Sequence, residues 1–213
     1  MKLSQIIVNI RGCNGAGKSS IPMSMLDDPE MYVVEKPYKG KVKKIATVFP
    51  SYGWVALGTY FNKTGGLDGF PDTYLTKKAF WYILKRYPEY NLMLEGILAS
   101  TVFSTYAELF KEAKKRYPER EAYIISLLPP IEICLRRIQK RNGGKTIKED
   151  LVANKWQTVQ RNLTKFQLEG LKSFAWDNRG AMKKGKPKLI HQLEKLIEAY
   201  EYNPDFADDW VPF

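Results

Sequence analysis

Residues 12–19 read Gly-Cys-Asn-Gly-Ala-Gly-Lys-Ser, and they follow a short run rich in isoleucine and valine at residues 5–10. The octet matches the pattern Gly-x-x-x-x-Gly-Lys-Ser/Thr in full, in the strand–loop–helix context that the pattern requires. Glycines let backbone N–H groups turn toward phosphate oxygens, because no Cβ stands in the way. The start of the helix that we expect next adds a positive dipole end. The stretch therefore predicts a P-loop for the phosphates of a nucleoside triphosphate, ATP.

Two residues of this loop have specific expected tasks. We expect Lys18 to reach the β- and γ-phosphates during catalysis, and the Ser19 hydroxyl to bind Mg²⁺. The residues expected to hold ATP are Gly12, Asn14, Gly15, Ala16, Gly17, Lys18, Ser19 and Ser20. The alternative is a glycine-rich turn that matches by chance, and the agreement of pattern and context disfavours it.

The rest of the chain alternates short apolar runs with longer amphipathic segments. Strands are expected at residues 5–10, 31–35, 44–49, 54–60, 91–95, 121–128 and 173–176, and helices at 17–25, 72–87, 101–117, 131–141, 148–171 and 187–201. This alternation is typical of a mainly parallel sheet covered on both faces. We therefore predict an α/β, three-layer P-loop NTPase sandwich over residues 1–200, with a small β insertion, a short lid at about 136–150 and an acidic, aromatic tail at 201–213.

The composition of the chain argues against several classes of protein. None of its 213 residues falls in a run of 18 apolar residues, so no transmembrane helix is expected. The phosphate loop begins too close to the N-terminus for a cleaved signal peptide, which indicates a cytoplasmic protein. Two cysteines, Cys13 and Cys134, do not make a disulfide framework, and a single histidine argues against a histidine-based metal site.

An acid closes the apolar run at residues 91–95. Glu95 is expected to hold Mg²⁺ or its water shell, as strand-end acids do in P-loop enzymes. Gly96 follows it and would let the chain pass close to the phosphates. A strand-terminal acid that simply faces solvent is the alternative.

Basic residues at the end of a predicted helix indicate a lid. Arg137 and Arg141 share one helix face at a spacing of four residues, and two glycines follow them. Such arginines can close over a transferring phosphoryl group and neutralise its charge. The alternative is a solvated basic helix face.

Asp68 is the candidate general base. Glycines on both sides of it would let the backbone approach a substrate closely. An alcohol acceptor must lose its proton as the new O–P bond forms, and a positioned carboxylate can accept that proton. The alternatives are an aspartate that caps a turn and Glu35 as the base.

Positive charge dominates the sequence. There are 34 Lys and Arg residues against 23 Asp and Glu residues, a net charge of +11. This excess favours a polyanionic partner, although phosphate-handling enzymes also carry solvated lysines. Five lysines fall within residues 36–44, on a predicted hairpin. They could contact a nucleic-acid backbone or protect an edge strand from aggregation.

Several short pieces of sequence together carry a family resemblance. They are Leu-Gly-Thr-Tyr at 57–60, Gly-Gly-Leu-Asp at 65–68, Leu-Glu-Gly at 94–96 and Arg-Asn-Gly-Gly-Lys at 141–145. With the P-loop, they make residues 5–175 resemble thymidylate-kinase-like phage P-loop kinases, among them the 5-hydroxymethyluracil DNA kinases. The resemblance implies a host-cell cytoplasmic enzyme that uses ATP and Mg²⁺ to phosphorylate the hydroxymethyl group of that base in DNA, with Asp68 as base and Arg137 and Arg141 in the lid.

Other functions stay open at this stage. A deoxynucleoside monophosphate kinase would use the same P-loop and lid, but would leave the basic excess and Asp68 unexplained. A nucleotide-dependent DNA-binding or packaging module would need oligomer contacts or a coupled domain. The last alternative is a kinase that acts on another alcohol, such as the 5′-hydroxyl end of a polynucleotide.

Overall fold

One seven-stranded sheet organises the computed structural model, which describes residues 5–61, 65–143, 147–181 and 185–204. The strand order is β2-β3-β4-β5-β1-β6-β7, with β1 in the interior of the sheet. The strands are β1 Ile6–Arg11, β2 Tyr32–Tyr38, β3 Lys41–Phe49, β4 Trp54–Leu57, β5 Asn91–Glu95, β6 Glu121–Leu127 and β7 Ser173–Trp176. Every residue of β1 is buried, as its run rich in isoleucine and valine predicts for a strand covered on both faces.

The sheet is mainly parallel. Strands β4, β5, β1, β6 and β7 run in the same direction, and the β2–β3 hairpin joins them as an antiparallel edge. The predicted β insertion is this hairpin. From β5 the chain crosses over β1 to reach β6, so the carboxyl ends of β5 and β1 form a switch point, where open α/β sheets bind ligands.

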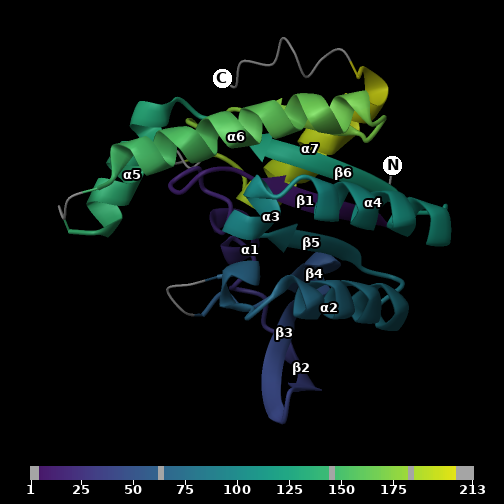
Figure 1. Cartoon of the computed structure of the whole chain (residues 1–213). Coiled ribbons are helices and arrows are strands. Elements are labelled where there is room, and N and C mark those ends of the chain that lie inside the picture. Colours follow the sequence, from purple (N-terminus) through teal and green to yellow (C-terminus); the bar gives the residue numbers. More distant parts are fainter. Residues whose placement is uncertain (1–4, 62–64, 144–146, 182–184, 205–213) are drawn as a thin grey trace.

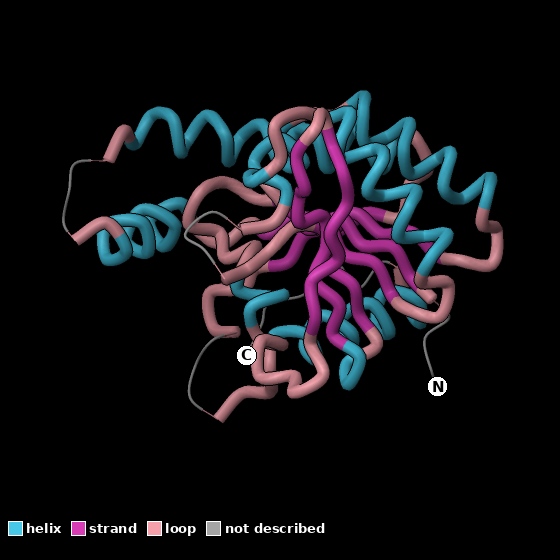
Figure 2. Tube along the Cα trace, turned by 90° about the horizontal axis from the view of Figure 1, so that it is seen from below, coloured by secondary structure: helices cyan, strands magenta, loops and turns pink. Residues whose placement is uncertain are grey.

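Helices cover both faces of the sheet and complete three layers (Figure 1). They are α1 Ser20–Met23, α2 Thr73–Arg86, α3 Ile97–Thr101, α4 Ser104–Arg116, α5 Ile131–Arg141, α6 Glu149–Leu168 and α7 Leu189–Tyr202, with short 3₁₀ turns η1 Pro50–Tyr52 and η2 Leu67–Gly69. Phe80, Phe110 and Phe166 pack from α2, α4 and α6 into one core. Ile21 and Leu193 pack from α1 and α7 into the other. Seen from below, the sheet is a twisted layer between these helices (Figure 2).

Two predicted helices begin three residues later in the structure than expected. The helix expected at 17–25 is regular only over α1, because Pro22 has no N–H and the bonds that follow are of the i→i+3 type, such as Met25 N–H to Pro22 O. The helix expected at 101–117 is α4, which begins at Ser104, and the short helix α3 precedes it where none was predicted. Val102 is extended between them, with φ −83° and ψ 124°.

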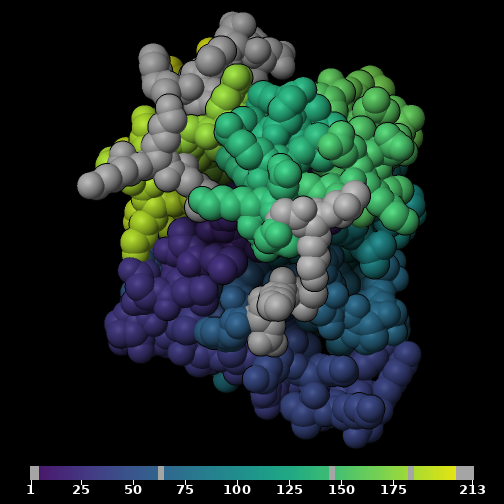
Figure 3. Space-filling model, turned by 90° about the vertical axis from the view of Figure 1, so that its left-hand side faces the viewer, coloured from purple at the N-terminus to yellow at the C-terminus, as the bar shows by residue number. Residues whose placement is uncertain are grey.

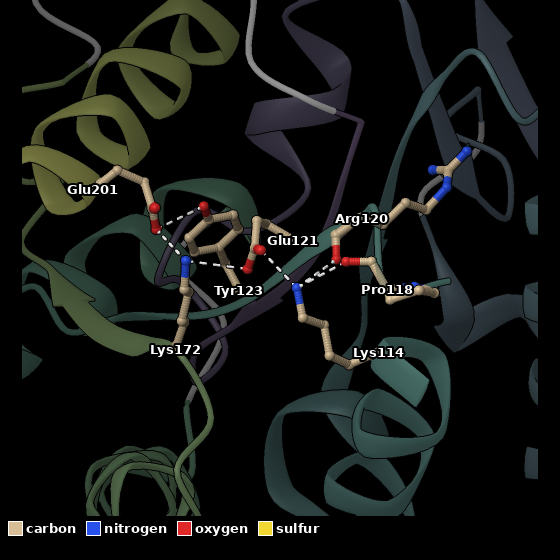
Figure 4. Close-up of polar contacts among 7 residues, drawn as sticks. All are labelled: Lys114, Pro118, Arg120, Glu121, Tyr123, Lys172 and Glu201. Carbon is tan, nitrogen blue, oxygen red and sulfur yellow. Dashed lines mark hydrogen bonds and ion pairs between the residues drawn. The ribbon is translucent and has the colours of Figure 1, made fainter. Parts of the chain in front are cut away.

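A polar cluster fastens α7 to the end of the sheet away from the phosphate loop (Figure 4). The Tyr123 hydroxyl donates to Glu201 over 2.8 Å, and Lys172 Nζ lies 2.7 Å from Glu201 and 3.1 Å from Glu121. Lys114 Nζ on α4 lies 2.6 Å from the other oxygen of Glu121. Glu201, which the sequence analysis placed both at the end of the last predicted helix and at the start of the tail, is therefore helical and docked.

Some predicted features lie outside the described residues. These are part of the glycine-rich loop (62–64), Gly144 and Lys145 of the lid, and the tail from 205 onward with Trp210 and Phe213. Within the described parts of the chain, none of the helices combines the length and the hydrophobicity of a membrane-spanning segment.

Phe110→Ala tests whether α4 covers this face of the sheet. The side chain is fully buried against Phe80, so truncation should lower the free energy of unfolding by about 3–5 kcal/mol. Leu168→Ala is the control, because Leu168 is 83% exposed and should change stability by less than about 0.5 kcal/mol. Urea unfolding of both variants measures the difference, and equal values would contradict this packing.

Candidate active site

The phosphate loop lies at the carboxyl end of β1, where the switch point predicts a ligand. Gly15 and Gly17 have φ values of +79° and +96°, which side-chain-bearing residues rarely adopt. A Cβ on Gly15 would stand 2.4 Å from the carbonyl oxygen of Cys134 on α5. Glycine is therefore required at position 15 for two reasons: the positive φ of the backbone, and the close approach of α5 to the loop.

The loop presents free backbone donors. The N–H groups of Gly15, Gly17, Lys18 and Ser19 make no hydrogen bond with any described residue. Lys18 Nζ donates to the carbonyl oxygens of Gly12 and Cys13 over 3.0 and 3.1 Å. Burial lowers the pKa of Lys18, while Glu95 and Asp68 act in the opposite direction. The loop thus gathers N–H groups and an ammonium group around one place, as a phosphate cradle needs.

Arg11, which the sequence interpretation missed, anchors the base of this loop. Its guanidinium donates to the carbonyl oxygens of Ser100 and Val102 over 2.6 and 3.1 Å and lies 4.6 Å from the centre of the Phe166 ring. The Ser100 hydroxyl in turn accepts from Gly12 N–H over 3.1 Å. An arginine that ends a buried apolar run was the signal available in the sequence.

Ser19 and Glu95 meet across the switch point. The Ser19 hydroxyl donates to Glu95 Oε1 over 3.1 Å, and the second oxygen, Oε2, has no partner among the described residues. Burial raises the pKa of Glu95 to about 6, against the opposing influence of Lys18 and Ser19. A hydroxyl and a carboxylate with an unused oxygen are the hard ligands that Mg²⁺ prefers, so these two residues fit the ion.

The glycine-rich segment closes over Glu95. A Cβ on Gly66 would lie 2.3 Å from Glu95 Oε1, and Gly66 itself has φ +59°. Thr59 and Gly66 form an antiparallel bridge that fixes the base of the loop. Gly66 is thereby held against Glu95, which is bonded to Ser19 of the phosphate loop.

Asp68 lies beside the switch point, whereas Glu35 lies on the outermost strand of the sheet. Asp68 lies on η2 with an exposed side chain, and its Oδ1 accepts from Ile97 N–H over 2.7 Å. It therefore caps α3 and leaves Oδ2 with no described partner. Glu35 is exposed on β2, the edge strand, four strand positions from β1, or about 19 Å.

Only one of the two predicted lid arginines reaches the phosphate loop. Arg137 Nη1 donates to the carbonyl oxygens of Gly15 and Ala16, each over 3.3 Å. Arg141 is exposed one turn further along α5 and makes no contact with the loop among the described residues. Asn178, after β7, also holds the loop, through a bond from Nδ2 to Ala16 O of 2.8 Å. No local pattern marks Asn178, because only the fold places it there.

Ser20 and Asn14 complete the predicted loop set. Ser20 begins α1, and its N–H bonds to Gly17 O over 3.1 Å. Asn14 Oδ1 lies 3.5 Å from Nζ of Lys155 on α6, a second basic residue that the sequence interpretation missed. Sheet topology, phosphate loop and the Ser19–Glu95 pair together define a P-loop protein with a kinase-like site.

Comparison with known proteins narrows this class to a family. The family model described as 5-hmdU DNA kinase matches residues 4–171. The chain therefore belongs to the 5-hmdU DNA kinase family. This agrees with the resemblance found in the sequence motifs.

Three phage proteins illustrate the relationship. The 5-hmdU DNA kinase of Bacillus phage SP10 is 49% identical over a match that covers 81% of this chain and 27% of that protein. The 5-hmdU DNA kinase 1 of Salmonella phage ViI is 35% identical, with 70% and 66% covered. The 5-hmdU DNA kinase of Pseudomonas phage M6 is 34% identical, with 76% and 86% covered. The match thus spans less than two thirds of the SP10 and ViI proteins.

Glu95→Gln should stabilise the nucleotide-free protein at neutral pH. The folded-state pKa of about 6 exceeds the ordinary 4.5, so folding opposes ionisation of Glu95 above pH 6. This difference between the two pKa values lowers the free energy of unfolding by about 2 kcal/mol. The destabilisation is absent below pH 4.5 and complete above pH 6. Glutamine keeps the acceptor for Ser19 and removes the charge.

Unfolding of both proteins in urea at pH 7.5 and pH 4.5 measures this effect. The gain from Glu95→Gln should approach 2 kcal/mol at pH 7.5 and fade at pH 4.5. Glu89→Gln, which changes an exposed carboxylate, should show no such pH dependence. A gain that persists unchanged at pH 4.5 would mean that Glu95 is not held in a desolvated place.

Proposed function

We propose that this protein is an ATP-dependent kinase that phosphorylates the hydroxymethyl group of 5-hydroxymethyluracil in DNA. The observation that carries the proposal is a carboxylate, Asp68, held with a free oxygen beside the switch point where the phosphate loop lies, in a member of the 5-hmdU DNA kinase family. The phage relatives support host-cell cytoplasm as the place of action.

The chain's own groups divide the work around the transferred phosphoryl group. Backbone N–H groups of the loop and Lys18 would bind the phosphates, and Arg137 stands beside the loop to balance negative charge. Ser19 and Glu95 would hold Mg²⁺, which supplies charge neutralisation on the phosphate oxygens when bound. Arg141 would join from the lid.

Asp68 distinguishes an alcohol acceptor from a phosphate acceptor. The hydroxymethyl oxygen attacks the γ-phosphorus, the bond from that phosphorus to the bridging oxygen of ADP breaks, and the hydroxyl proton passes to Asp68. A nucleoside monophosphate is already ionised at neutral pH and needs no base. The deoxynucleoside monophosphate kinase alternative would therefore leave Asp68 without a chemical task, and the family relationship does not favour it.

Lys18→Ala should remove phosphoryl transfer. Loss of one phosphate clamp typically lowers the rate by ~10²–10³. Transfer of radiolabel from ATP to 5-hydroxymethyluracil DNA measures the loss, with ordinary DNA and free nucleotides as parallel acceptors. A variant that is folded by circular dichroism and retains more than about a tenth of the activity would refute this assignment of the phosphate site.

Asp68→Asn tests the base with little structural disturbance. Asparagine retains the oxygen that accepts from Ile97 N–H, so α3 should keep its cap and thermal stability should barely change. Asparagine cannot take the proton, so kcat should fall by roughly ~10²–10⁴ while the Michaelis constant for ATP stays nearly constant.

Glu35→Gln is the matched control and should be active, because Glu35 lies on the edge strand away from the loop. An active Asp68→Asn with an inactive Glu35→Gln would move the base to the hairpin. Two active variants would favour a phosphate acceptor, and with it the nucleotide kinase.

A further inference from the structure

Basic residues are concentrated in one part of the chain. Residues 32–86 contain ten Lys and Arg residues and three acids, so they carry +7 of the net +11. This segment includes the β2–β3 hairpin and α2, and α2 contains no acidic residue. The catalytic residues of the phosphate loop lie elsewhere in the sequence, so they do not account for this charge.

Three of the five lysines of the hairpin lie on one face of it. Lys36 pairs with Lys43 and Tyr38 pairs with Lys41 across the two strands. Opposed residues of an antiparallel pair share a face, and so do residues two apart on one strand. These four side chains therefore lie on the same side of the hairpin.

That side of the hairpin faces α2. Tyr74, Lys78 and Tyr82 follow one another at intervals of four residues, so they form a stripe along the helix. Lys36 Nζ lies 4.0 Å from the centre of the Tyr82 ring, and Tyr38 and Tyr74 have ring centres 6.4 Å apart. Lys78 Nζ lies 4.6 Å from the centre of the Tyr74 ring. Hairpin and helix thus make one lysine–tyrosine surface.

This surface has little acid to neutralise it. Among the described residues, Lys36, Lys41, Lys43 and Lys78 make no ion pair. Lys39 at the turn does, with Asp72 over 3.2 Å. Protection of the edge strand would explain a charge on β2, but it would not explain Lys78 on α2.

The surface is connected to the active site by a short piece of chain. The Tyr38 hydroxyl donates to Asp72 Oδ2 over 2.6 Å, and Asp72 Oδ1 accepts from Leu75 N–H to cap α2. Asp72 follows Asp68 by four residues. Figure 3 looks onto the end of the sheet that carries the phosphate loop, and the hairpin, in dark blue, lies at the lower margin of the same face.

We infer that the lysine–tyrosine surface of Lys36, Lys41, Lys43 and Lys78, with Tyr74 and Tyr82, binds the sugar–phosphate backbone of the DNA beside the base that is phosphorylated. The inference rests on the proposed function for the identity of the polyanion. Unpaired ammonium groups bind phosphates as point charges and release counterions from the DNA. Contact with aromatic rings keeps two of these groups, those of Lys36 and Lys78, close to the surface.

The test compares two double variants that remove the same charge. Lys41→Gln with Lys43→Gln changes the proposed surface. Lys115→Gln with Lys195→Gln changes exposed lysines on α4 and α7. Fluorescence anisotropy with a 5-hydroxymethyluracil duplex gives Kd over a series of salt concentrations, and thermal unfolding checks that each variant is folded.

The hairpin variant should flatten the slope of log K against log salt by about 1.8, which is 0.9 for each lost phosphate contact. Binding at 0.15 M salt should weaken on the order of tenfold or more. The control variant should match the wild type. A hairpin variant with the slope of the control would overturn the inference.

Measuring DNA binding and phosphate transfer separately distinguishes a failure of this inference from a failure of the proposed function. If the wild type transfers no phosphate to the duplex but the hairpin variant still loses slope, the kinase proposal fails and the DNA surface stands. If transfer proceeds and the two double variants bind alike, the kinase proposal stands and DNA binds elsewhere.

Discussion

A buried carboxylate beside a buried ammonium group governs the arrangement of this site. Glu95 is fully buried at the end of β5, and Lys18 is nearly so at the end of the neighbouring phosphate loop. Charged groups can stay in such a place only with partners, which Ser19 supplies in part. The strand adjacency of β5 and β1 and the bare backbone of Gly66 both serve to bring these groups together without steric conflict.

The sequence predicted those parts of the molecule that local pattern determines. Strands β5 and β7 and helix α5 have their predicted bounds, because apolar runs and flanking glycines or prolines mark their ends. Helix α3 was missed, since five residues are too few to show a helical period. The sequence marked both Arg137 and Arg141 as basic helix residues. That Arg137 and not Arg141 contacts the phosphate loop depends on tertiary packing, which residue spacing does not reveal.

The segment between β4 and α2 connects the phosphate-binding site with the lysine–tyrosine surface. Near its beginning, Gly66 lies against Glu95 beside the phosphate loop, and its end is fixed by the Tyr38–Asp72 bond against the hairpin. Asp68 lies between these two attachments and is also bonded to α3. The position of this carboxylate is therefore set jointly by the site that holds phosphates and by the basic surface.

The cluster that docks α7 has a practical consequence for joining other polypeptides to this one. Ile6, the first residue of β1, is paired with Glu121, and Glu121 and Tyr123 belong to the same polar cluster as Glu201 near the end of α7. The first strand and the last helix therefore meet at the pole of the sheet remote from Lys18. A polypeptide joined directly to Ile6 or to the end of α7 at Tyr202 would therefore begin at the end of the sheet opposite the catalytic residues.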